Sequence, residues 1–144
     1  MTKKTLTLAM IFVFAHIAFV APFVSSKNIL PAGFGALSMA SMALVLVLAA
    51  RWRIVDRILG GPDKSYGSHR WLGLFAIGGG LAHWALASPV GLGILPALAG
   101  RGSDAGLIAM LGLIVLTLAA MVRVIPYHIW KASHMLMGPL FLLA

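Results

Sequence analysis

The stretch "HRWLGLFAIGGGLAH", residues 69–83, places a histidine at each end of an apolar, glycine-rich segment. On an α-helix, fourteen residues correspond to about 1400° of rotation and about 21 Å of rise. His69 and His83 are therefore expected on one helix face at two depths. Ionisable residues within a membrane helix usually face the bundle interior and mark a function. The stretch predicts a membrane helix that presents two sites on one face.

The composition indicates an integral membrane protein. Of the 144 residues, 61% are hydrophobic and only 10% are charged, and the mean hydropathy is +1.02, which leaves too little polar surface for a soluble domain. The formal charge of +8 comes from basic residues that lie between apolar runs, so it indicates topology and not a nucleic-acid partner. The absence of cysteine excludes thiolate haem ligation, iron–sulfur clusters and covalently attached haem.

The apolar runs predict an all-α, multi-pass helical bundle in a single domain, residues 1–144. The expected elements are about five transmembrane helices at about residues 5–25, 33–51, 69–92, 105–123 and 134–144, with a short interfacial helix at about 51–59. The first run exceeds the core of about 7–15 residues typical of signal peptides, which favours a retained helix over a cleaved leader.

The last run is incomplete as a membrane span. Its eleven residues from His134 to Ala144 extend about 16 Å as a helix, half of a hydrocarbon layer of about 30 Å. We therefore expect the chain to be a fragment. The alternative is a half-crossing segment that partner proteins cover.

The basic residues predict the orientation, because short cytoplasmic loops collect lysine and arginine. The N-terminus, the 51–70 loop and the 123–133 loop are rich in them: Lys3, Lys4, Arg51, Arg53, Arg57, Lys64, Arg70, Arg123 and Lys131. The two remaining loops have one each, Lys27 and Arg101. We expect a multi-pass protein of the cell (inner) membrane, surrounded by the lipid bilayer, with a cytoplasmic N-terminus.

The histidines suggest an iron site. Neutral imidazole suits iron, and helical bundles build cofactor sites from side chains on facing helices. His134 begins the last predicted helix as His69 begins the third, so both are expected at the cytoplasmic edge, where they would form an axial pair for one haem iron. By the same spacing, a partner for His83 would lie beyond Ala144. The alternative for any one histidine is a hydrogen bond to a neighbouring helix.

Other residues near these histidines allow two interpretations. Gly73 and the triplet 78–80 leave room for a flat macrocycle, and each glycine costs about 1 kcal/mol relative to alanine, but close helix packing would also use them. Arg70 could pair with a haem propionate or only add to the cytoplasmic positive charge. For His16 we favour a structural hydrogen bond, and His128 is expected in the loop before the last helix.

Two segments carry a family resemblance: "RILGGPDKSYGSHRWLGLFAIGGGLAHW" and "IPYHIWKASHMLMGPLFLLA". From about Arg51 to Ala144 the chain resembles the ferric reductase-like transmembrane domain family, which includes ferric reductases, NADPH oxidases and the haem membrane subunit of the methionine sulfoxide reductase system. The resemblance implies two stacked b-type haems, each held by one histidine from each of two helices, and electron transfer across the membrane. His69, His83 and His134 match three of the four ligands.

The chain departs from the family pattern in two ways. The fourth histidine is absent, so one haem b is expected here and two in a complete chain. Many members continue into a flavin and nicotinamide domain, whereas no dinucleotide fingerprint is present here. The resemblance thus implies the membrane haem part of an oxidoreductase, which receives electrons from FAD and NAD(P)H through a missing flavin reductase domain or a separate electron donor.

Two alternatives remain open. A haem-free proton-relay or transporter subunit would use the intramembrane histidines, but the three acidic residues, Asp56, Asp63 and Asp104, are all expected in loops or at helix edges. A purely structural assembly subunit would show no cofactor, no flux and stable association with a partner.

Overall fold

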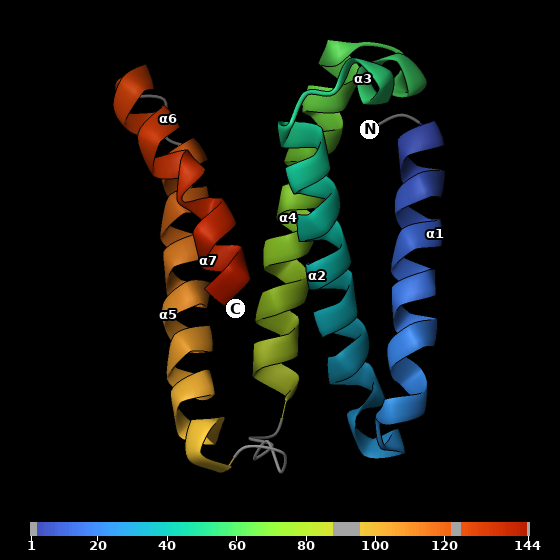
Figure 1. Cartoon of the computed structure of the whole chain (residues 1–144), viewed down its shortest axis with the longest axis vertical. Helices are drawn as coiled ribbons and strands as arrows, with labels where there is room; N and C mark the ends of the chain where they lie inside the picture. The colour runs from blue at the N-terminus through green and yellow to red at the C-terminus, as the bar shows by residue number, and fades with distance from the viewer. Residues whose placement is uncertain (1–2, 88–95, 122–124, 144) are drawn as a thin grey trace. The chain divides into compact units, whose positions relative to one another are not determined.

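The computed structural model describes residues 3–87, 96–121 and 125–143 and divides the chain into two compact units, Met1–Ser88 and Pro89–Ala144 (Figure 1). Every regular element in these ranges is helical. The all-α fold class predicted from the sequence is confirmed.

The first unit is built around one central helix. Its elements are α1 (Lys3–Val20), η1 (Ala21–Phe23), η2 (Ser26–Asn28), α2 (Ile29–Ala49), α3 (Arg53–Leu59) and α4 (Pro62–Leu86). Helix α2 packs against α1 and, most extensively, against α4 (Figure 1). The residues buried along α2 and α4 are mostly small, among them Ala36, Ala40, Ala76 and Gly79. Small side chains let two helices approach closely, so the core of this unit lies between α2 and α4.

The boundary between α3 and α4 is set by two glycines and a proline. Gly60 and Gly61 have positive φ angles of 90° and 125°, which glycine adopts without steric cost. Pro62 then begins α4, since proline at the first helical position lacks only an N–H that would have no partner in the helix. The sequence predicted that this helix starts at about His69. Helix α4 instead starts seven residues earlier, at Pro62.

The second unit contains α5 (Pro96–Met121), α6 (Tyr127–Met135) and α7 (Met137–Leu143), and α5 packs against both shorter helices. Two predictions were wrong here. His134 does not begin a helix but lies one residue before the end of α6, and His128 lies in α6 instead of a loop.

Prolines explain both corrections. Pro126 has an extended backbone (φ −55°, ψ 138°) and precedes the first residue of α6, so the helix begins right after the proline and before the apolar run. Helix α6 ends at Met135 because Pro139 has no N–H to donate to the Met135 carbonyl and its ring crowds that oxygen. The helical path resumes as α7.

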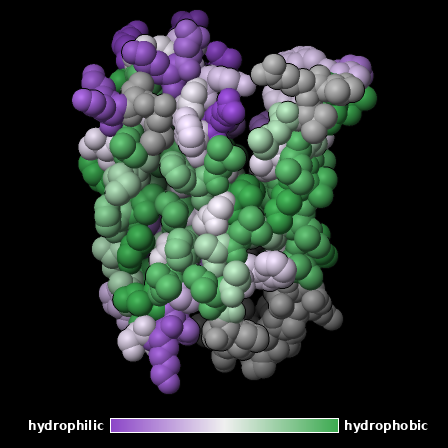
Figure 2. Space-filling view, turned by 180° about the vertical axis from the view of Figure 1, so that it is seen from behind, coloured by the Kyte–Doolittle hydropathy of each residue, from purple (hydrophilic) through white to green (hydrophobic). Residues whose placement is uncertain are grey.

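Long apolar helices are present in the first unit. Within the described residues, Lys3–Phe23 and Ser26–Ala49 are long and apolar enough to cross a membrane, with mean hydropathies of 2.2 and 2.0. The apolar part of α5, Ala105–Met121, is shorter. Hydrophobic residues cover the sides of the first unit, and hydrophilic residues gather at the end where α3 lies (Figure 2). The five predicted spans stay a prediction.

Candidate functional site

The two histidines of α4 each bond to a backbone carbonyl of α2. His69 Nδ1 lies 3.3 Å from the Val45 oxygen, and His83 Nδ1 lies 2.8 Å from the Pro31 oxygen. A carbonyl oxygen only accepts, so Nδ1 carries the proton in both rings, and a neutral imidazole then has its lone pair on Nε2. Metal-ligating histidines use this arrangement, with one ring nitrogen on the metal and the other donating to a carbonyl or carboxylate.

These contacts belong to a regular seam between α2 and α4. Midway between the histidines, the Ser38 hydroxyl donates to the Ala76 carbonyl over 2.6 Å. The three contacts recur every seven residues, at positions 69, 76 and 83 of α4 and at positions 45, 38 and 31 of α2. We call these six residues the α2–α4 seam. The antiparallel helices keep the same faces together over its whole length. Both histidines therefore lie on one face of α4, as their spacing predicts, and the structure shows that this face contacts α2.

A glycine of α2 makes room for the His83 ring. A Cβ added at Gly35 would lie 2.9 Å from His83 Nδ1 and 3.3 Å from its Cε1, so the ring occupies the space of an absent side chain. Neither Gly35 nor Pro31 was predicted from the sequence as a residue of the site. The glycine within an apolar helix was a visible signal, but its partner on another helix could not be read from it.

The glycines of α4 divide into two groups. A Cβ at Gly79 would lie 3.0 Å from both the Phe34 carbonyl oxygen and the Ser38 backbone nitrogen, so close packing against α2 explains this glycine. Gly73 and Gly78 would have nothing within 4 Å, and Arg70 is exposed. The predicted roles of Gly73 and Arg70 beside a haem stay predictions.

His134 belongs to the second unit. Its ring stacks on Trp130, with centroids 5.1 Å apart and planes inclined by 18°, and Tyr127 lies against the same indole at 5.7 Å. Because His69 and His134 are in different units, their predicted pairing stays a prediction. His16 is half-buried on α1.

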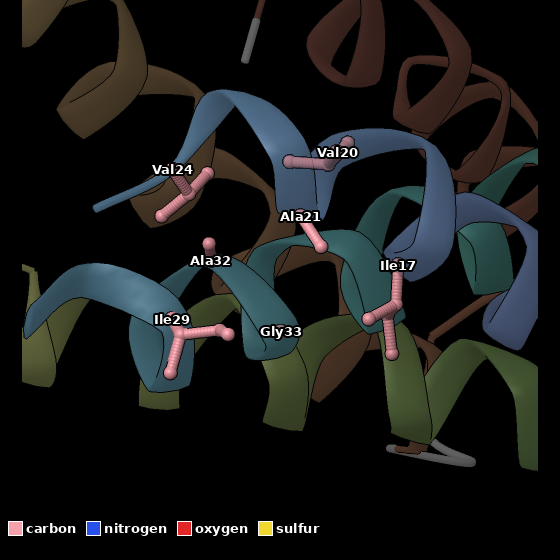
Figure 3. Close-up of a pocket in the computed structure, with 7 residues that line it drawn as sticks. All are labelled: Ile17, Val20, Ala21, Val24, Ile29, Ala32 and Gly33. Carbon is pink, nitrogen blue, oxygen red and sulfur yellow. The ribbon is translucent and has the colours of Figure 1, made fainter. Parts of the chain in front are cut away.

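Other features of the described residues offer less chemistry. No group of three or more His, Cys, Asp or Glu side chains there could hold a metal ion. A hollow between the end of α1 and the start of α2 is lined by apolar residues and so has no polar side chain to orient a ligand (Figure 3). Its lining residues are Ile17, Val20, Ala21, Val24, Ile29, Ala32 and Gly33. The α4 histidines are therefore the strongest candidate site.

Comparison with known families finds a match over most of the chain. The family model described as the ferric reductase like transmembrane component matches residues 34–144, about three quarters of the chain. The match includes α4 and both of its histidines, and also His134. No curated protein and no solved structure matches the chain.

Proposed function

The chain belongs to the ferric reductase-like transmembrane family, and from this membership we propose that it is a haem-binding domain that carries electrons across the membrane. As a member of this family it is a membrane protein whose apolar helix surfaces face the lipid bilayer. The observation that carries the proposal is the contact of Nδ1 of both α4 histidines with carbonyl oxygens of α2, which assigns a proton to Nδ1 and turns Nε2 toward a ligating role.

The residues present fit a haem. Imidazole nitrogen is a common axial ligand of haem iron, and Nε2 of His69, His83 and His134 would be the ligating atoms. A bound haem would supply one-electron redox chemistry at its iron. The Nδ1–H bonds to Val45 and Pro31 hold the rings in one orientation and raise the basicity of the opposite nitrogen.

We further propose a membrane topology and the roles of the site residues. The two units form one transmembrane domain, residues 1–144, in the inner membrane, with the N-terminus and the polar end at α3 on the cytoplasmic side. His69 lies nearer that end, with His134 as its ligating partner, and His83 lies about 21 Å further along α4. Arg70, exposed beside His69, would pair with a propionate. Electrons enter from a cytoplasmic flavin and nicotinamide donor, in a domain of the same protein or in a separate partner.

The test is haem content in purified chains. A reduced-minus-oxidised absorption spectrum of the wild type should show a b-type haem, with about one haem per chain. His69→Ala should lose this haem, whereas His16→Ala, a change of the same kind outside the seam, should keep it. Haem content in His69→Ala equal to that of His16→Ala would overturn the ligand assignment.

Absence of haem from the wild type would overturn the function itself. In that case, proton flux into haem-free liposomes that depends on the α4 histidines would support the relay alternative.

A further inference from the structure

We propose that Gly35 is a positioning residue that, together with the Pro31 carbonyl, fixes the orientation and the protonated nitrogen of His83. The inference rests on the proposed function only where it treats His83 as a haem ligand. The contacts of the His83 ring with Gly35 and Pro31 do not depend on that function. If Gly35 has this role, α2 is a functional part of the site, although α2 itself supplies no ligand.

The steric part of the argument comes from the space at Gly35. Three atoms of the His83 ring, Nδ1, Cε1 and Cγ, lie 2.9, 3.3 and 3.4 Å from the position of an added Cβ. Contacts of 3.4–4 Å are ordinary for a Cβ, and distances under 3.0 Å require something to shift. Any side chain at position 35 would therefore push the ring away from α2 at the nitrogen that makes its hydrogen bond.

The Pro31 carbonyl is the hydrogen-bond acceptor for His83 Nδ1. The Pro31 carbonyl lies in the first turn of α2, four residues before Gly35, and Pro31 itself is buried. A carbonyl oxygen has two lone pairs, so it can serve the helix and His83 together. The acceptor residue is buried, whereas the His83 side chain is exposed, so the contact is part-buried. At 2.8 Å it is well within the range of a strong N–H···O contact.

The seam contains its own comparison at His69. The residue four positions after the acceptor Val45 is Ala49, which is equivalent in register to Gly35. The Nδ1–oxygen distance is 3.3 Å at this end against 2.8 Å at His83. The shorter bond thus occurs where the equivalent position has no Cβ.

A matched pair of substitutions isolates the effect. Gly35→Ala places a methyl group against the His83 ring. Gly33→Ala makes the same change two residues away on the same helix, where an added Cβ has nothing within 4 Å. Both gain the same helix propensity, so a difference between them reports on the ring.

The experiment is nitrogen-15 NMR of the full chain, labelled at histidine and purified from membranes in the reduced state, in which any low-spin haem iron is diamagnetic. The His83 signals are assigned by their loss in His83→Ala. We expect a downfield Nδ1 proton in the wild type and in Gly33→Ala, and its loss or upfield shift in Gly35→Ala.

Two results would overturn the proposal. One is a wild-type His83 whose Nδ1 carries no proton, which needs no variant and decides the matter even if Gly35→Ala cannot be purified. The other is identical His83 signals in Gly35→Ala and Gly33→Ala. Because the Nδ1 proton is expected with or without haem, failure of this inference is distinct from failure of the proposed function, which haem content measures separately.

Discussion

Replacing Gly79 by alanine should separate α2 from α4, and the structure gives the size of the effect. The added Cβ would lie 3.0 Å from backbone atoms of Phe34 and Ser38, and ordinary contact begins at 3.4 Å. Backbone atoms cannot turn aside as a side chain can, so the two helices must part by about 0.4 Å at this point. Overpacking of this kind typically costs about 1–3 kcal/mol, because it also stretches neighbouring contacts such as the 2.6 Å bond from Ser38 to Ala76.

The neighbouring glycine provides the control. Gly78→Ala meets nothing within 4 Å and should stabilise the chain by up to about 1 kcal/mol through helix propensity. Gly79→Ala has the same gain, but its packing cost should leave it less stable than the wild type by about 1 kcal/mol. The pair should therefore differ by about 2 kcal/mol, roughly a 30-fold difference in the ratio of folded to unfolded protein.

The assay is reversible unfolding of the purified variants in a denaturing detergent titration, followed by circular dichroism. Gly79→Ala should unfold at a lower detergent fraction than the wild type, and Gly78→Ala at the same or a higher fraction. Equal stability of the two variants would refute the close approach of α2 and α4 at Gly79.

Three further predictions concern other described residues. Ser41 has a buried hydroxyl with no hydrogen-bond partner among the described residues, so Ser41→Ala should raise the free energy of unfolding by about 1 kcal/mol, and a lower value in the same titration would contradict this. Ser68, fully buried, donates to the Lys64 carbonyl at 2.7 Å and contacts a hydroxyl of α1 at 3.1 Å; Ser68→Ala should lower the free energy of unfolding by about 1–2 kcal/mol. If a haem lies against the open side of Gly73, Gly73→Leu should reduce haem per chain while Gly78→Leu, about 180° away from His69 on the helix, should not; equal haem in both would argue against a haem contact at Gly73.

Much of the helical architecture could be predicted because hydropathy and glycine placement act within one segment. The short helix predicted at about 51–59 is α3, which ends at Leu59 before two glycines, but α4 already begins at Pro62, and the apolar run alone could not show this. The start of the helix that contains His134 was also predicted from the apolar run alone, and it was placed at His134 although α6 begins at Tyr127. An apolar run marks the lipid-facing part of a helix, whereas prolines such as Pro126 mark where the backbone begins to turn.

The sequence could predict the two histidines of the site but not their hydrogen-bond acceptors. The spacing of His69 and His83 is a property of one helix, so periodicity places them on one face. Their acceptors, Val45 and Pro31, depend on how far α2 slides along α4, and that register is fixed by packing between two helices.

The positions of both His69 and His83 depend on the close packing of α2 against α4. Gly79 brings the backbones together, and this close approach is what lets the α4 histidines reach carbonyls of α2 from two positions fourteen residues apart. A hydrogen bond to a backbone carbonyl cannot be changed by substituting the acceptor's side chain, so the orientation of both rings is tied to the register of the helices. Changes in helix spacing should therefore act on both histidines together, whereas a change at Gly35 should act on His83 alone.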